Sequence, residues 1–293
     1  MDYMEAKTIH SQNRYEKFNE DPTFLFLNQF MKNGNRELQV SFLDFLNFYP
    51  QGRRIDDKFN EIYDFVKSNN LLPAIKNFIL QNRHIALWYS PSETQSLLEE
   101  LHNIPLSQDE FSPNNSIDKQ LFTKIHNVSN MSELKYVIDT MEDMLKKKIY
   151  WTYYNTQTTR IIEDIFSIHP NVIPTLVDIK GVDFFINNLP IDLKITRLPK
   201  GFTENFDKDI LIKWFYENQS EQRFGAENRL FLVLNDRENP DNTDWLKITH
   251  YDDVKDVINQ YLDNFSEEQM ENISFTFTGK SFNVKSDLIF INI

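Results

Sequence analysis

Residues 181–196 read GVDFFINNLPIDLKIT, and this stretch specifies the central element of the fold. Two runs of branched and aromatic residues, 182–186 and 191–196, have the composition of short β-strands. They flank the Asn187-Asn188 pair, and asparagine is favoured in the tight turns of β-hairpins. The stretch therefore predicts a β-hairpin.

Each strand of this hairpin carries a carboxylate flanked by apolar residues, Asp183 on the first and Asp192 on the second. Because side chains alternate between the two faces of a strand, Asp192 and Lys194 share a face. Burying an unpaired charge is costly, so packing alone explains these charged residues poorly. Two carboxylates and a main-chain carbonyl suit a hard cation such as Mg²⁺, which polarises a phosphoryl oxygen and lowers the pKa of its water. This constellation points to phosphodiester hydrolysis.

The spacing of apolar residues changes at Pro170. Before it, apolar residues recur at three and four positions, which predicts helices, the last of them from Ser132 to Ile168. Beyond it, short runs typical of strands alternate with two helical stretches. The expected strands are 182–186, 191–196, 229–234, 273–278 and 288–293, and the expected helices between them are 202–219 and 251–265. The sequence thus predicts the α/β (α+β) class, with a helical domain at 1–130 and a mixed sheet flanked by helices at 131–293.

Composition narrows the class of protein. The 293 residues carry a net charge of −13, which argues against a surface that is basic everywhere and binds nucleic acid without selectivity. No cysteine occurs, which excludes disulfides and thiolate metal sites, and the six glycines lack the spacing of a dinucleotide-binding or Walker loop. No apolar stretch is long enough to span a membrane and no secretory signal opens the sequence, so we expect a cytoplasmic protein.

The hairpin residues resemble the motif of the PD-(D/E)xK nuclease superfamily, and in particular that of the type II restriction endonucleases. Asp183 corresponds to the first acid, eight residues intervene, and Asp192-Leu193-Lys194 corresponds to the DxK element on the second strand. Val182 stands where the motif has proline, a position that varies across the superfamily. Many members add a glutamate on the helix before the hairpin, and Glu163 lies on such a helix, outside its apolar positions.

The resemblance implies a role for each of these residues. Asp183 and Asp192 would bind Mg²⁺ together with the main-chain carbonyl of Leu193. Glu163 would be a further ligand or hold a second ion, and Lys194 would activate water. The resemblance also implies a restriction-endonuclease-like sheet, double-stranded DNA as substrate and a companion DNA methyltransferase. Cutting both strands of a duplex favours a homodimer, because two related sites then meet two antiparallel strands.

Other interpretations stay open. A repair or recombination nuclease on the same fold would act on structured DNA without sequence choice, and a non-catalytic interaction module would use the same side chains as a structural ion network. Asp178 is an alternative first acid. Arg197 and Lys200, just after the second strand, are candidates for contacts with DNA phosphate, although ordinary surface charge explains them equally well.

Overall fold

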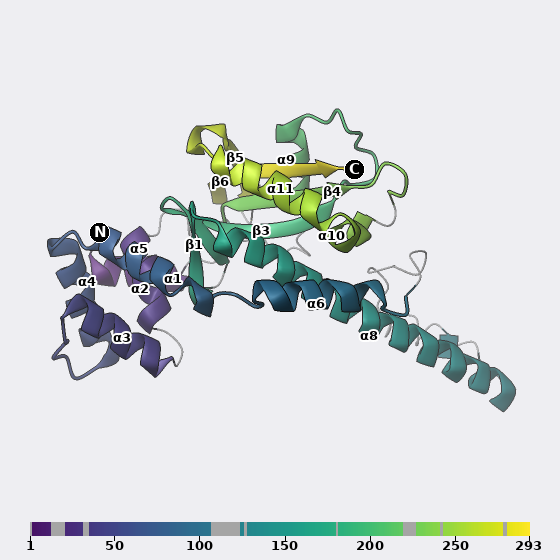
Figure 1. The fold of residues 1–293 in the computed structure, drawn as a ribbon, viewed down its shortest axis with the longest axis horizontal. Helices are drawn as coiled ribbons and strands as arrows, with labels where there is room; N and C mark the ends of the chain where they lie inside the picture. The colour runs from purple at the N-terminus through teal and green to yellow at the C-terminus, as the bar shows by residue number, and fades with distance from the viewer. Residues whose placement is uncertain are drawn as a thin grey trace.

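A computed structural model describes most of the chain, and its strands form a single sheet (Figure 1). The described residues are 2–12, 21–31, 35–106, 124–125, 128–179, 181–218, 227–240, 243–277 and 280–293. The strands are β1 (Val172–Ile179), β2 (Val182–Ile186), β3 (Leu189–Arg197), β4 (Arg229–Asn235), β5 (Glu271–Phe277) and β6 (Lys280–Asn292). Their order in the six-stranded sheet is β1-β2-β3-β4-β6-β5.

The sheet is mixed, as the sequence predicts. β1, β2 and β3 pair antiparallel in succession, whereas β4 lies parallel to both β3 and β6. β5 closes the far edge antiparallel to β6. The expected hairpin is confirmed: β2 and β3 are joined through Asn187-Asn188, and Asn187 adopts the left-handed φ of 60° that tight hairpin turns require.

Helices pack on the sheet and precede it in the chain, so the α/β class is confirmed. The helices before the sheet are α1 (Tyr3–Gln12), α2 (Pro22–Met31), α3 (Arg36–Leu46), α4 (Ile55–Ser68), α5 (Leu72–Gln81), η2 (Arg83–Ile85), α6 (Pro91–His102) and α8 (Met131–Ile168). Those that follow the hairpin are α9 (Lys208–Asn218), η4 (Thr243–Trp245), α10 (Leu246–Thr249), α11 (Tyr251–Asp263) and η5 (Glu267–Gln269). No helix in the described ranges is long and apolar enough to cross a membrane.

The central strand β4 shows how both faces of the sheet are covered. Leu230, Leu232 and Leu234 pack in one apolar cluster with residues of α8 and α11. Phe231 and Val233 point to the other face and pack with residues of α9. All seven residues of β4 are buried, which agrees with the continuous apolar run expected of a strand covered on both faces.

The helices before α6 pack against the hairpin edge of the sheet. Ile173 and Leu176 of β1 and Phe185 of β2 belong to one apolar cluster with residues of α1 to α5. The ring of Phe26 in α2 lies 4.3 Å from that of Phe185, centroid to centroid. Side chains from both sides of residue 130 therefore share one core, and the division into two domains at this residue stays a prediction.

Several elements differ from the sequence prediction. β6 begins at Lys280, eight residues before the strand expected at 288–293. β1 was not expected, because Pro174 interrupts its run of apolar residues and proline cannot donate to a sheet ladder. β1 is an edge strand of the sheet, where proline is tolerated. The helix expected at 202–219 begins only at Lys208, where the Asp207 carboxylate accepts a hydrogen bond from the N–H of Ile210.

Candidate active site

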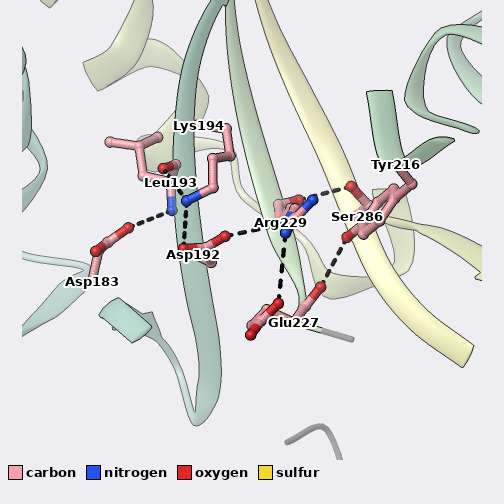
Figure 2. Close-up of polar contacts among 8 residues, drawn as sticks. All are labelled: Asp183, Asp192, Leu193, Lys194, Tyr216, Glu227, Arg229 and Ser286. Carbon is pink, nitrogen blue, oxygen red and sulfur yellow. Dashed lines mark hydrogen bonds and ion pairs between the residues drawn. The ribbon is translucent and has the colours of Figure 1, made fainter. Parts of the chain in front are cut away.

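The hairpin opens at its two acids. β2 and β3 pair from Phe184 opposite Ile191 to the turn, so Asp183 and Asp192 are the next residues on each strand. From Asp192 onward β3 pairs with β4. The Asp183 carboxylate bridges the opening, because its Oδ2 accepts a hydrogen bond from the N–H of Leu193 at 2.6 Å (Figure 2). The two acids are therefore neighbours at the point where β3 leaves β2.

The main chain of β3 presents the peptide groups of Leu193 to Asp183. The N–H of Asp192 donates to the carbonyl of Asn228 at 2.9 Å, on the β4 side. Since successive residues of a strand direct their peptide groups to alternate sides, the N–H and C=O of Leu193 face away from β4. The Leu193 carbonyl therefore lies on the same side of β3 as Asp183, in agreement with the ligand pair that the family resemblance implies.

Lys194 and Asp192 share one face of β3, as their spacing predicts. Lys194 Nζ lies 2.7 Å from Oδ1 of Asp192, and the lysine side chain is 42% exposed. The other oxygen, Oδ2 of Asp192, accepts a hydrogen bond from Nε of Arg229 at 3.2 Å. Both oxygens of this buried carboxylate are therefore paired with cations, one at the surface and one inside the protein.

Arg229, the first residue of β4, belongs to the site although no sequence pattern singled it out. Its Nη2 lies 3.6 Å from Oε2 of Glu227, and its guanidinium lies over the ring of Tyr216 at 5.0 Å from the centroid. Ser286 Oγ donates to the main-chain carbonyl of Arg229 at 2.8 Å. Figure 2 shows how these contacts enclose the arginine and hold it beside Asp192. The signal available in the sequence was a charged residue at the head of an otherwise apolar strand.

A cavity of about 330 Å³ lies next to Asp183. Its lining includes three carboxylates, those of Glu163 on α8, Asp178 on β1 and Asp183 on β2. No lysine, arginine or histidine is among the described residues that line it. The structure thus brings Glu163 to Asp183, and it brings Asp178, the alternative first acid, to the same cavity.

The shared environment shifts the pKa values of two of these acids. Burial, and after it the charge of Asp183, raises the pKa of Glu163 to about 7. Burial also raises the pKa of Asp183 to about 6, together with the charge of Asp192. Carboxylates that share one cavity disfavour one another's charged forms. A cation bound among them would relieve this repulsion.

The unpaired oxygens in the cavity fit a hard divalent cation. Among the described residues, Oδ1 of Asp183 and Oε1 of Glu163 take part in no hydrogen bond or ion pair. No cluster of three or more His, Cys, Asp or Glu in those same ranges is arranged to hold a metal. Mg²⁺ does not need such a cluster, because it keeps several waters and is commonly bound through one or two carboxylates. Asp183, Glu163 and the Leu193 carbonyl are therefore the groups that fit it. The carbonyl accepts a hydrogen bond from Lys194 at 3.4 Å but keeps a second lone pair, whereas both oxygens of Asp192 are paired with cations.

Arg197 and Lys200 lie apart from this cavity. Arg197 is the last residue of β3. Burial raises the pKa of Asp244, but Lys247 and, to a smaller extent, the charge of Arg197 lower it below its ordinary value. Lys200 is exposed in the turn that follows β3. Neither residue lines the cavity, so a contact between them and DNA phosphate stays a prediction.

Comparisons with known proteins identify no relative of this chain. No protein-family model, no curated protein and no solved structure matches it. The function is therefore argued from the geometry of the site.

Proposed function

We propose that this protein is a Mg²⁺-dependent endonuclease of the restriction type, which hydrolyses phosphodiester bonds of double-stranded DNA. The observation that carries the proposal is the close placement of three side chains, those of Asp183, Glu163 and Lys194. Asp183 and Glu163 line a cavity that has no basic residue among its described lining, and the Lys194 ammonium lies at the same opening of the hairpin. Oxygen ligands for a hard cation beside an exposed ammonium are the parts that phosphoryl chemistry needs.

The carboxylates of Asp183 and Glu163 and the Leu193 carbonyl would hold the cation in the cavity. When bound, a divalent cation polarises a phosphoryl oxygen and lowers the pKa of an attacking water. Lys194 carries three N–H donors, of which two are directed to Asp192 Oδ1 at 2.7 Å and to the Leu193 carbonyl at 3.4 Å. The third can donate to the substrate, where it would stabilise negative charge on the phosphate or steady the attacking hydroxide.

In this proposal Asp192 positions Lys194. Its two oxygens hold Lys194 on one side and Arg229 on the other, so it sets the position of the lysine ammonium. In the family resemblance Asp192 is itself a metal ligand, and it could take that place if Lys194 moved to the phosphate on substrate binding.

The same proposal implies a compartment, a partner enzyme and an oligomeric state. A restriction enzyme would act in the cytoplasm on duplex DNA, beside a DNA methyltransferase that protects the host. A homodimer would bring two such sites to the two strands.

A second candidate is a non-catalytic interaction module. The observation that favours it is the pairing of both Asp192 oxygens, because an ion network satisfied by Lys194 and Arg229 needs no metal. Calorimetric titration with Mg²⁺ or Mn²⁺ separates the two candidates. Site-specific binding supports the nuclease, and its absence supports the module.

The direct test is incubation of the purified protein with supercoiled plasmid and Mg²⁺. We expect cleavage into defined bands, loss of cleavage on addition of chelator, and no cleavage by Asp183→Asn. A smear would favour a nuclease without sequence choice. Intact plasmid under all conditions, with DNA of varied sequence, would contradict the proposal.

A further inference from the structure

Residues 83–90, which lead from α5 to α6, are held against the last turns of α8 by hydrogen bonds. The Asp164 carboxylate accepts hydrogen bonds from the N–H groups of Trp88 and Tyr89, each at 2.9 Å and each on a different oxygen. Arg83 Nη1 donates to the carbonyl of Ile168 at 2.6 Å. These contacts fix residues 83–90 to the helix that carries Glu163, and residues 85–88 line the acidic cavity.

The side chain of Trp88 is held at two places by α8. Its indole Nε1 donates to Oε2 of Glu163 at 2.9 Å. The guanidinium of Arg160 lies over its ring, 4.3 Å from the centroid. Yet Trp88 is 53% exposed, so burial in an apolar core does not account for its fixed position. Large apolar side chains on a protein surface are ordered at an entropic cost, which suggests that the position of this indole has a use.

We propose that Trp88 is a positioning residue, whose indole N–H holds the Glu163 carboxylate toward the cavity so that Oε1 is ready to bind a divalent cation. This inference rests on the metal site of the proposed function and extends it to a residue from the helical half of the chain. The hydrogen bond occupies Oε2 and leaves Oε1 without a partner among the described residues. Groups that orient a metal ligand raise metal affinity because the ligand need not be ordered on binding.

Residues 83–90 would thus fix the Glu163 carboxylate in one orientation, which α8 alone does not do. Glu163 projects from a helix, and a glutamate has several rotamers of similar energy. The stacking of Arg160 fixes the plane of the indole, and the indole fixes the carboxylate. Asp164 in turn fixes the main chain from which the indole extends.

The test is calorimetric titration of Mn²⁺ into the metal-free full chain, without DNA. Trp88→Phe keeps an aromatic ring beside Arg160 and removes the pyrrole ring with its N–H donor to Glu163. We expect it to weaken Mn²⁺ binding about tenfold, the lower end of the effect of losing a group that orients a ligand. Trp214→Phe is the matched control. Trp214 lies on α9 and packs against Phe202 and Phe215, so its replacement should leave the affinity unchanged.

A double-mutant cycle shows whether Trp88 acts through Glu163. In a Glu163→Gln background, the further change Trp88→Phe should leave Mn²⁺ affinity unaltered, whereas a general structural effect would weaken binding in both backgrounds. Equal losses in the two backgrounds, or no loss in either, would overturn the role of Trp88. Absence of Mn²⁺ binding by the wild-type protein would instead overturn the metal site, and with it the proposed function.

Discussion

The guanidinium of Arg229 lies 3.2 Å from the carboxylate of Asp192, and the two side chains are only 7% and 8% exposed. A buried ion pair contributes little net stability when intact, because both ions have lost their hydration. Breaking it is costly, because the remaining ion is left in the interior without its partner. The pair therefore makes the position of Asp192, and through it that of Lys194, part of the folded state.

Removal of this arginine should destabilise the protein strongly. We expect Arg229→Met to lower the free energy of unfolding by about 3 kcal/mol, the lower end for a broken buried pair, because Lys194 still contacts Asp192. Urea denaturation measures the change. Arg237→Met is the control, since its pair with Glu204 is 57% and 43% exposed and should contribute about 1 kcal/mol or less. Equal losses from the two variants would show that the Arg229 pair is not effectively buried.

Removal of the lysine should affect activity and not stability. Lys194→Ala should abolish plasmid cleavage, because it removes the partly exposed ammonium at the hairpin opening. Its side chain is 42% exposed, so the free energy of unfolding should change by about 1 kcal/mol or less. Lys146→Ala, on an exposed part of α8, serves as the control in the cleavage assay. Cleavage by Lys194→Ala at the wild-type rate would exclude a catalytic role for this residue.

The sequence predicts those parts of the site that depend on local spacing. The hairpin and the shared face of Asp192 and Lys194 follow from a period of two and a two-residue turn, and both are confirmed. Glu163 could be placed on a helix outside its apolar positions, but the cavity that it shares with Asp183 depends on how α8 packs on the sheet.

The parts that the sequence does not predict depend on long-range contacts. Trp88 and Glu163 are 75 positions apart in the sequence, and Arg229 and Asp192 are 37 positions apart. No local periodicity of the sequence therefore relates the residues of either pair. β1 is missed for a different reason. Its proline is typical of a loop, and only its place at the edge of the sheet makes a strand possible there.

The acids of the cavity should destabilise the protein when no cation is present. Asp183→Asn removes a charge that burial and Asp192 disfavour, and the amide oxygen can still accept the hydrogen bond from Leu193. We therefore expect a higher Tm for the variant than for the wild-type protein in the presence of chelator. Added Mg²⁺ should raise the Tm of the wild type and leave that of the variant nearly unchanged. Thermal unfolding with and without Mg²⁺ checks both statements, and a lower Tm for the metal-free variant would contradict them.

The difference in free energy of unfolding between Asp183→Asn and the wild type should depend on pH. The pKa of Asp183 is about 6 in the folded protein, above the ordinary value of 3.8, so the folded state binds this proton more tightly than the unfolded state. The resulting stabilisation is fully present below a pH of about 4 and is lost as the pH rises through about 6. Asparagine does not titrate. In urea denaturation with chelator, the variant should therefore exceed the wild type in free energy of unfolding at a pH of about 8, and the gap should close towards a pH of about 4. A gap that stays constant over this range would mean that the pKa of Asp183 is not raised.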